Sequence, residues 1–391
     1  MADRAIVEAA AERRTPVTIL VSVDGLRPDA LGRGNTPTLD ALARQGVSAE
    51  MRPSFPTNTF PNHYTLVTGL RPDRHGVVDN TMEDQARPGI RFRLADPKQT
   101  RDAFWWNGAE PIWVSAERAG ILTGTMFWPG SEAPIRGVRP SAWFPYDAAI
   151  TSGQRVRTVL DWLRRPAAER PRLLTLYFDV VDKASHEVGY ASPEERSAVR
   201  EIDGAIAGLR NGLATMRQPV QLIVVSDHGM AAIPADNLLD PDDVVDEASA
   251  RTIFAGGTLS VFPNAGAERT VTARALMPRA HQRCYRREDL PARFAFGRHP
   301  RVPPLLCLAE VGWRYAREVP RRYLKGEHGY DPAHPSMRAM FIAHGPGFRV
   351  GARLPVFDNV DVYPLLRDLI GLPPATGLDG NAVTLESARR R

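Results

Sequence analysis

The sequence predicts an α/β fold in which a mostly parallel central sheet is covered by helices on both faces and carries a small inserted subdomain. Three largely apolar runs of strand length support this prediction, namely Val17–Val23, Leu173–Phe178 and Val220–Val225. Apolar runs of this kind are typical of strands that are buried on both faces. Helical patterns lie between the runs, and strands that alternate with helices favour a parallel sheet.

The first predicted unit is a strand, an acidic residue and a helix. Asp24 and Gly25 end the first strand, which places a carboxylate at its carboxyl end. Thr36 followed by Pro37 has the pattern of a helix start, because threonine is a favourable cap and proline fits the first helical position. We expect this helix to end at Gly46.

The later elements follow the same pattern. The motif Ser192-Pro193-Glu194-Glu195 predicts a capping box that opens a helix running to about Leu213. A proline- and arginine-rich region at about 240–323 is interpreted as an insertion over one edge of the sheet. The chain returns to the core with a strand at Arg338–Ala343 and a final helix around Val360–Leu369.

Size and charge bound the class of protein. The 391 residues are enough for one large domain, which we expect over residues 15–391 after an N-terminal tail over 1–14. The net charge of +5 comes from dispersed arginines, so it is compatible with anionic substrates and predicts no nucleic-acid arm. No stretch approaches the ~20 apolar residues of a membrane span. The tail lacks the apolar segment of a signal peptide, so we expect a cytoplasmic protein, or a periplasmic or secreted one if a signal was removed.

The two cysteines, Cys284 and Cys307, permit one disulfide bond. Cys307 lies in the apolar run Leu305–Leu308, where a buried free thiol is the simpler interpretation. We therefore expect free thiols. The two residues also lack the spacing of a thiolate metal site.

Acidic and imidazole side chains follow the predicted strands. Ligands of parallel sheets gather at the carboxyl ends of strands, where we expect Asp24, Asp182 and Asp227. A mixture of oxygen and nitrogen donors favours zinc over magnesium or calcium. The complete set of candidate ligands is Asp24, Thr59, Asp182, His186, Asp227, His228 and His328. Seven ligands exceed the needs of one open site and suit two metals, ~3.5–4 Å apart, bridged by a substrate.

Thr59 is the candidate nucleophile. A threonine hydroxyl is a poor nucleophile at its own pKa, and coordination to a Lewis-acidic cation makes it reactive near neutral pH. Each part of the pattern has an ordinary alternative: Asp227 and His228 suit a capped turn, and Asp182 with His186 suits a surface pair. The whole set, in order at strand ends, favours the metal site.

These segments together resemble a known family, the nucleotide pyrophosphatase/phosphodiesterases of the alkaline-phosphatase superfamily. The resemblance covers nearly the whole chain and implies an alkaline-phosphatase-like fold. The matching segments are Val-Ser-Val-Asp24-Gly, Phe-Pro-Thr-Asn-Thr59-Phe-Pro-Asn-His, His75-Gly-Val-Val-Asp-Asn80, Phe127-Trp-Pro-Gly, Leu-Tyr177-Phe, Ser-Asp227-His228-Gly-Met, Glu-His328-Gly-Tyr and Ala343-His-Gly-Pro.

The resemblance implies two zinc ions. One would be held by Asp24, Thr59, Asp227 and His228, and the other by Asp182, His186 and His328. Thr59 would attack phosphorus to give a covalent phosphothreonine diester, which water activated at the second zinc would then hydrolyse.

The resemblance also implies how substrate is held. Asn80 would contact a non-bridging phosphate oxygen in the transition state. Phe60, Tyr146 and Tyr177 match the aromatic positions that sandwich a nucleobase, although their spacing alone suits ordinary core packing.

The chain departs from the family pattern at two positions that often carry lysine, which are Asn58 and Thr81 here. The loss of these charges predicts a preference for singly charged diesters over ATP. Lys183 and Ser185 also depart from the usual serine-like residue and glycine near the second metal. None of these changes removes a predicted ligand.

We therefore expect a two-zinc phosphodiesterase that splits nucleotide-type diesters and releases a nucleoside 5′-monophosphate. One alternative is a diesterase of the same fold that acts on lysophospholipids or choline-containing diesters. Another is a catalytically inactive, metal-containing binding protein, against which the intact ligand set argues. The sequence leaves the oligomeric state open.

Overall fold

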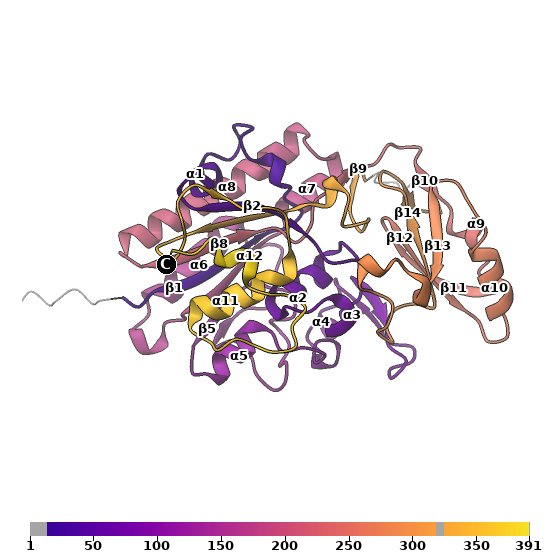
Figure 1. The fold of residues 1–391 in the computed structure, drawn as a ribbon, viewed down its shortest axis with the longest axis horizontal. Coiled ribbons are helices and arrows are strands. Elements are labelled where there is room, and N and C mark those ends of the chain that lie inside the picture. The colour runs from indigo at the N-terminus through magenta and orange to yellow at the C-terminus, as the bar shows by residue number, and fades with distance from the viewer. Residues whose placement is uncertain (1–13, 318–323, 391) are drawn as a thin grey trace, which may run out of the picture.

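The structure is a computed structural model that describes residues 14–317 and 324–390. The predicted tail therefore lies outside the described residues apart from Arg14. A nine-stranded central sheet forms the core of the molecule, with the order β18-β2-β17-β8-β1-β7-β5-β6 and with β19 also paired to β2 (Figure 1). The strands are β1 (Val17–Val23), β2 (Val47–Arg52), β5 (Thr123–Met126), β6 (Ala142–Trp143), β7 (Leu173–Phe178), β8 (Val220–Val225), β17 (Ala339–His344), β18 (Ala352–Arg353) and β19 (Phe357–Asp358).

The sheet is mostly parallel. β1 pairs in parallel with both β7 and β8, and β5 pairs in parallel with β7 and β6. β17 alone runs the other way, antiparallel to β8 and β2. The three strands predicted first are thus neighbours, so their carboxyl ends meet at one edge of the sheet.

Helices cover both faces of the sheet. One face packs against α1 (Pro37–Gln45), α6 (Ser152–Arg164) and α8 (Pro193–Thr215), and the other against α2 (Thr59–Thr68), α5 (Ile112–Arg118) and α11 (Val362–Ile370). Side chains alternate between the two faces along β1. Ile19 and Val21 pack on the face covered by α1, α6 and α8, whereas Leu20 packs on the opposite face. The predicted fold class is confirmed.

Two helix starts show where the local sequence determines the capping residue and where it does not. The hydroxyl of Ser192 accepts from the N–H of Glu195 at 3.0 Å, which is one half of the predicted capping box. The N–H of Ser192 donates to the carbonyl oxygen of Gly189 instead of to Glu195. Thr36, by contrast, makes no side-chain cap. The carboxylate of Asp203 in α8 caps α1 instead, by accepting from the N–H groups of Thr38 and Leu39 at 3.0 and 2.9 Å.

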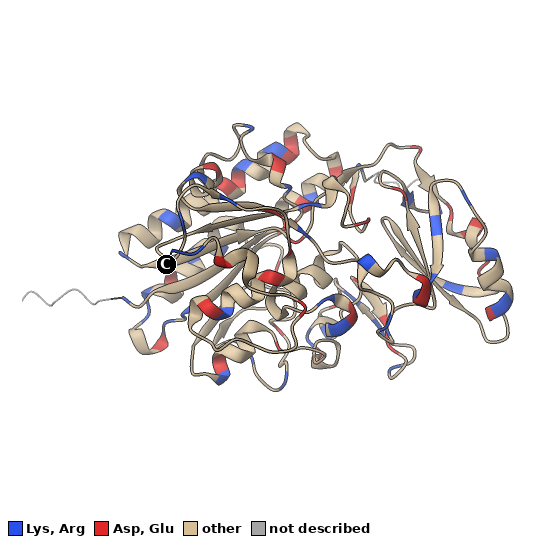
Figure 2. Cartoon of the chain, viewed as in Figure 1, with Lys and Arg blue, Asp and Glu red and all other residues tan. Residues whose placement is uncertain are grey.

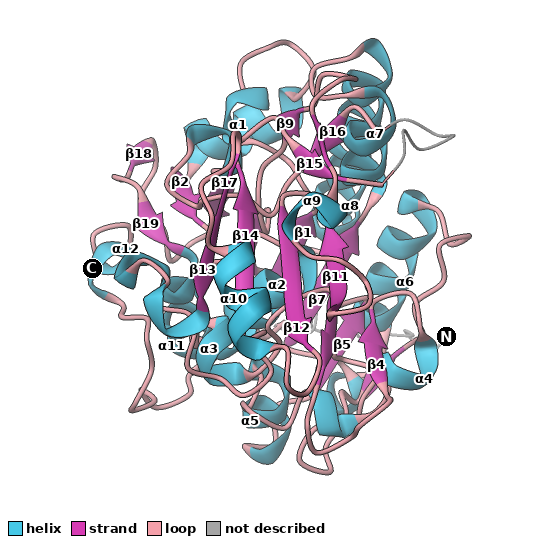
Figure 3. Cartoon of the chain, turned by 90° about the vertical axis from the view of Figure 1, so that its right-hand side faces the viewer, coloured by secondary structure: helices cyan, strands magenta, loops and turns pink. Residues whose placement is uncertain are grey.

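A smaller antiparallel sheet, ordered β11-β12-β14-β13, lies at one end of the molecule (Figures 1 and 3). It has its own core, which includes Leu259, Val261 and Val271. Its elements are α9 (Pro241–Val244), β11 (Ala250–Ala255), β12 (Thr258–Pro263), α10 (Glu268–Ala275), β13 (Gln282–Arg286) and β14 (Leu305–Ala309). The remaining elements are α3 (Pro72–His75), β3 (Thr81–Glu83), β4 (Arg91–Arg93), α4 (Pro97–Thr100), α7 (Val180–Val188), β9 (Ala231–Ala232), β10 (Leu238–Leu239), β15 (Arg314–Tyr315), β16 (Gly326–Glu327) and α12 (Val383–Glu386), besides short 3-10 turns.

The prediction of free thiols is wrong. Cys284 and Cys307 form a disulfide bond between β13 and β14. The two residues face each other directly in the antiparallel register of these strands. The apolar run around Cys307 indicated burial correctly, since Cys307 is fully buried, but it carried no information on the partner strand.

Charged residues of both signs are interspersed over the elements visible in Figure 2. Within residues 14–317 and 324–390, no helix combines the length and the apolar character that crossing a membrane requires.

Candidate active site

The candidate residues lie where strands of the central sheet end. Asp24 directly follows β1, Asp227 comes two residues after β8, and Asp182 is in the first turn of α7, just beyond β7. Gly25 allows this approach because it has φ +68°, and a Cβ atom there would lie 3.1 Å from Oδ1 of Asp182. Thr59 is the first residue of α2.

One group of candidate ligands surrounds His228. Its Nε2 atom lies 3.3 Å from Oγ1 of Thr59, 3.1 Å from Oδ2 of Asp227 and 3.6 Å from Oδ1 of Asp24. Its Nδ1 atom is 2.9 Å from the carbonyl oxygen of Gly229. A proton on Nδ1 satisfies that carbonyl and leaves the Nε2 lone pair facing the other three side chains.

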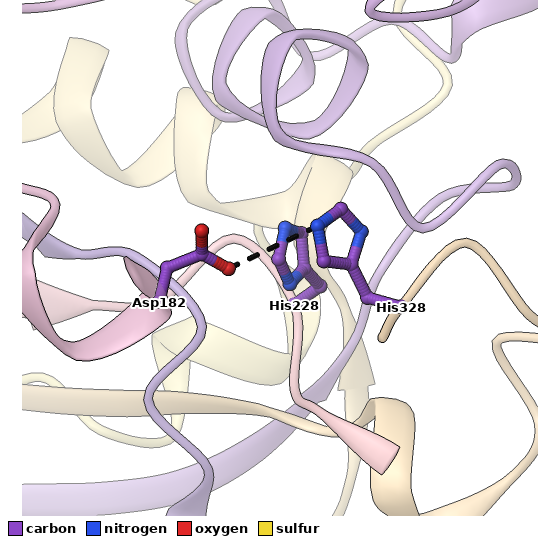
Figure 4. A group of neighbouring side chains, drawn as sticks. All are labelled: Asp182, His228 and His328. Atoms are coloured by element: carbon purple, nitrogen blue, oxygen red, sulfur yellow. Dashed lines mark ion pairs between the residues drawn. The ribbon is translucent and has the colours of Figure 1, made fainter. Parts of the chain in front are cut away.

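A second group surrounds Asp182. Its Oδ1 atom lies 3.5 Å from Nε2 of His186 and 3.8 Å from Nε2 of His328. The ring of His328 stacks on that of His228 with 3.8 Å between centroids, so the two groups adjoin. Figure 4 shows the carboxylate of Asp182 directed toward these two imidazoles. The structure therefore brings together all seven residues that the sequence suggested as ligands.

The donor set fits metal cations. Oδ1 of Asp24, Oδ1 of Asp182 and Oδ2 of Asp227 are buried and form no hydrogen bond with the residues that the structure describes. Burial of carboxylate oxygens without donors is unfavourable, and a bound cation would compensate them. These oxygens face imidazole nitrogens, which together make the mixed donor set that zinc favours.

Two further residues, His63 and Glu327, lie close enough to the candidate ligands to be considered as metal ligands themselves. His63 is near Asp24 and Asp227, but its Nε2 atom is 2.8 Å from Oγ of Ser22 and its Nδ1 atom 2.9 Å from the carbonyl of Thr59. Both ring nitrogens are thus engaged by these oxygen partners. Glu327 was missed by sequence reasoning.

Glu327 lies behind the second group. Its Oε1 atom is 3.8 Å from Nδ1 of His186 and accepts from the N–H of His328 at 3.2 Å. Nδ1 of His186 is also 2.9 Å from the carbonyl of Gly326. The only signal in the sequence was the position of Glu327 beside a candidate ligand.

The pKa values reflect competing carboxylates. Burial raises the pKa of Asp24 well above its usual range, and the charges of Asp227 and Asp182 raise it further. Burial opposes ionisation of Asp227 too, but His228 and His63 hold its pKa well below the usual range. Burial also disfavours the charged form of His228, yet Asp227 raises its pKa to about 8. Positive charge is thus stabilised at this point, as at many functional sites.

Tyr177 contacts the first group through its hydroxyl group, which donates to Oδ2 of Asp24 at 2.6 Å. The residue is 9% exposed. Sequence reasoning placed this ring beside a nucleobase and missed the hydrogen bond, because 153 residues separate the two partners. Such contacts orient metal ligands in many proteins.

The amino end of α2 points at the same place. Thr59 opens the helix, and the partial positive charge of a helix N-terminus favours an anion there. The N–H of Phe60 donates to Oδ1 of Asn80 at 2.9 Å. Because that oxygen is used, the NH2 group of Asn80 is the end that is left to donate to a ligand.

A cavity of about 500 Å³ opens above the site. Thr59, Asn80, Phe60, Tyr146 and Tyr177 all line it, so the structure also gathers the predicted substrate contacts. Tyr146 is 40% exposed, and its hydroxyl donates to Oδ2 of Asp179 at 2.6 Å. Asp179 is in turn held by the buried Arg155 at 2.8 Å.

The sequence matches the family model described as type I phosphodiesterase / nucleotide pyrophosphatase over residues 18–331. Similar proteins include human ectonucleotide pyrophosphatase/phosphodiesterase family member 1, which is 34% identical over 92% of this chain and 40% of its own length. A venom phosphodiesterase of Naja atra is 36% identical over 91% and 44%. A pyrophosphatase/phosphodiesterase of Schizosaccharomyces pombe is 34% identical over 95% and 80%.

The fold also matches solved structures. Human ectonucleotide pyrophosphatase / phosphodiesterase 5 superimposes with a TM-score of 0.91 and 30% identity, covering 96% of this chain and all of that one. The murine counterpart, as an inactive threonine-to-alanine variant in complex with AMP, gives a TM-score of 0.91 at 29% identity, with the same coverage. The chain spans only about two fifths of the length of the mammalian family member 1 proteins. It belongs to the type I phosphodiesterase / nucleotide pyrophosphatase family, a family of hydrolases.

Proposed function

We propose that this chain is a two-zinc phosphodiesterase that hydrolyses nucleotide-type phosphodiester or pyrophosphate bonds through a covalent intermediate on Thr59 and releases a nucleoside 5′-monophosphate. The observation that carries the proposal is the position of the Thr59 hydroxyl. It lies at the amino end of α2, 3.3 Å from Nε2 of His228, and it lines the cavity beside the other candidate ligands.

Asp24, Thr59, Asp227 and His228 would hold one zinc ion, and Asp182, His186 and His328 the other. Bound zinc supplies Lewis acidity, which lowers the pKa of a coordinated hydroxyl or water and offsets negative charge on the phosphate. The buried carboxylate oxygens without hydrogen bonds support this assignment.

The reaction on this chain has two displacements. In the first, the proton of the Thr59 hydroxyl passes to solvent, Oγ1 bonds to phosphorus, and the leaving oxygen departs with the electron pair of its broken bond. In the second, water bonds to phosphorus and releases a proton to solvent, the bond to Oγ1 breaks, and Oγ1 takes up a proton from solvent. The NH2 group of Asn80 donates to a non-bridging oxygen in both steps, and the N-terminus of α2 stabilises the negative charge.

Phe60, Tyr146 and Tyr177, here called the aromatic wall, account for the binding of a nucleoside substituent of the phosphate. Tyr146, Phe60 and Tyr177 line one cavity with Thr59. A base stacked there leaves its 5′-phosphate beside Thr59. The name of the murine relative, an inactive threonine-to-alanine variant with AMP, supports both the nucleophile and the product.

The first test compares substrates. The zinc-loaded protein should hydrolyse the nitrophenyl ester of thymidine 5′-monophosphate with a kcat/KM at least about 100-fold above that for nitrophenyl phosphate, because only the diester fills the aromatic wall. A panel of dinucleotides, nucleotide sugars and lysophospholipids decides the substrate class. A higher kcat/KM for lysophospholipids than for every nucleotide would overturn the nucleotide assignment.

The second test removes the nucleophile. Thr59→Ala should fold and bind metal, since six other candidate ligands remain, while kcat falls by at least about 1,000-fold. Thr59→Ser should retain measurable turnover because it keeps a hydroxyl. If Thr59→Ala turned over within tenfold of the parent, the attacking group would be water or another side chain.

A further inference from the structure

We infer that Asn58 is a positioning residue that fixes the ring of His328 in the second metal site and couples it to Asp79 and Asn80. This inference rests on the proposed function for the role of His328. It concerns a position at which this chain carries asparagine and where a long basic side chain could not make the same contacts.

The first observation is that Asn58 does not cap its own helix. It occupies the N-cap position of α2, where an asparagine side chain normally accepts from a backbone N–H, but it makes no such bond. Oδ1 of Asn80 accepts from the N–H of Phe60 instead. The amide of Asn58 therefore takes no part in capping α2. The residue is nevertheless buried, with an exposed fraction of 5%.

The released amide joins a partly buried carboxylate to a buried imidazole. Its Nδ2 atom donates to Oδ1 of Asp79 at 2.8 Å, and its Oδ1 atom lies 3.1 Å from Nδ1 of His328. The same Oδ1 of Asp79 accepts from the backbone N–H of Asn80 at 2.6 Å. Asp79 thus contacts both the segment that presents Asn80 and the side chain that supports His328.

Asp79 fixes which way the amide points. A carboxylate only accepts, so the NH2 end of Asn58 must face it and the carbonyl end must face His328. Nδ1 of His328 then meets two acceptors, Oδ1 of Asn58 and the carbonyl oxygen of Thr57 at 3.0 Å. The ring proton is therefore held on Nδ1, and the lone pair of Nε2 is left toward Asp182.

The backbone leaves room for this contact. Gly329 has φ +92°, and a Cβ atom there would lie 2.9 Å from Oδ1 of Asn58. A side chain at position 329 would displace the amide or the loop that carries His328. A lysine at position 58 has no acceptor atom, so it would pair with Asp79 and leave Nδ1 of His328 with the Thr57 carbonyl alone.

The test measures zinc affinity rather than turnover. Zn²⁺ is titrated into the metal-free protein at pH 8 in competition with a chromogenic chelator, which yields a dissociation constant for each site. Asn58→Leu should weaken one of the two sites by about 10- to 100-fold, the usual effect of losing a partner of a metal-bound histidine. The other site should change less than about threefold. The thermal midpoint of the metal-free protein should fall, because Asp79 loses a donor, so the comparison of the two dissociation constants is the measurement that decides.

Two substitutions at Asp79 provide the matched pair. Asp79→Asn keeps a carbonyl oxygen that can accept from Nδ2 of Asn58 and from the N–H of Asn80, so the affinity of each site for Zn²⁺ should stay within about threefold of the parent value. Asp79→Leu removes that acceptor and should weaken the same site as Asn58→Leu.

Failure of this inference is distinct from failure of the proposed function. If the parent binds two zinc ions and hydrolyses diesters, but Asn58→Leu leaves both dissociation constants unchanged, Asn58 is not a positioning residue. Equal weakening of both sites would assign Asn58 to general packing and overturn the inference. An unchanged dissociation constant for that site in Asp79→Leu would overturn the link to Asp79. A parent that binds fewer than two zinc ions would instead contradict the proposed function.

Discussion

Tyr177 has two roles, one for its ring and one for its hydroxyl group. The ring lines the cavity, and the hydroxyl donates to Oδ2 of Asp24. Tyr177→Phe keeps the ring and removes the hydrogen bond, so kcat should fall by about 10- to 100-fold while KM for a nucleotide diester changes little. Tyr177→Ala should also raise KM by the equivalent of ~1–3 kcal/mol of stacking. Steady-state kinetics of the two variants measure these effects.

A small methyl nitrophenyl diester is the control, because it has no base to stack. Its KM should respond equally to the two Tyr177 variants. If Tyr177→Phe retained the parent kcat, the hydroxyl would be dispensable for catalysis. If the KM values of both substrates rose equally in Tyr177→Ala, the ring would serve packing alone.

The two positions that often carry lysine in the family differ in their surroundings. Asn58 is buried against Asp79 and His328, so lysine there would alter the site instead of adding a solvated charge. Thr81 is partly exposed and directly follows Asn80. It is therefore the residue at which the effect of a missing charge can be measured cleanly.

Thr81→Lys should raise kcat/KM for ATP relative to nitrophenyl thymidylate. The gain should be about 1.4- to fivefold, which corresponds to ~0.2–1 kcal/mol for a solvated charge pair. It should shrink as salt is added, because screening weakens exposed charges. Thr81→Gln, which has no charge, is the control. An unchanged ratio in the lysine variant would show that the position does not sense the polyphosphate.

Among the secondary-structure elements, α3 supports α2 through a buried histidine. His75 closes α3, lies 3.1 Å from Oγ1 of Thr65 in α2, and accepts from the N–H of Val77 at 3.1 Å. Burial lowers its pKa to about 3. An unfolded histidine titrates near ~6.5, so below that pH the unfolded chain binds one more proton than the folded chain. The stability contributed by neutral His75 is therefore present above about pH 6.5 and is lost as the pH falls toward 3.

The variant His75→Asn tests whether neutral His75 causes stability to fall as the pH is lowered. Asparagine keeps an acceptor for the N–H of Val77 but does not titrate, so the variant should lose less stability than the parent between about pH 6.5 and 5. The difference in slope should approach about 1.4 kcal/mol per pH unit at the acid end. Urea unfolding of both metal-free proteins measures it, since the remaining histidines are common to the two. Parallel curves would contradict a depressed pKa.

Element boundaries were predictable where one segment contains the whole cause. The apolar runs that became β1, β7 and β8 have the predicted bounds, and Ser192 caps α8 as its own motif indicates. The helix expected around 360–369 is α11 at Val362–Ile370, but it is not the final one, since the short α12 follows it. Where the cause lies elsewhere in the chain, prediction failed: Asp203 caps α1 from α8, and Cys284 meets Cys307 only through the pairing of β13 with β14.

For the molecule as a whole, the candidate ligands could be predicted from local sequence, whereas the residues that orient them could not. Ligand types at strand ends could be predicted, because neighbouring parallel strands bring their carboxyl ends together. The contact of Asn58 with His328 spans 270 residues and depends on the loop at Gly329. No local pattern encodes such a contact, so the structure was needed to find it.

The candidate metal site also links distant parts of the sequence energetically. Asp24 lies after the first strand and His328 lies 304 residues further on, yet both face the same small volume with Asp182 and Asp227 between them. Without cations, three carboxylates oppose one another there, each with a buried oxygen that has no hydrogen bond among the described residues. Ligands that bind only the folded state stabilise it by about 2.7 kcal/mol when their concentration is 100 times Kd. Bound metal should therefore raise the thermal midpoint of the whole domain as well as permit turnover.

We accordingly expect elemental analysis to find close to two transition-metal ions per chain, and excess chelator to abolish activity and lower the thermal midpoint together. Stepwise return of Zn²⁺ should restore the midpoint in two stages if the sites differ in affinity, with turnover appearing only in the second, because the proposed reaction needs both ligand groups. Magnesium at the same concentration is the control and should restore neither, since imidazole donors disfavour it. A single tightly bound metal, or full activity in excess chelator, would contradict the two-metal site, and full activity in chelator would also require a nucleophile that is reactive without Lewis-acid activation.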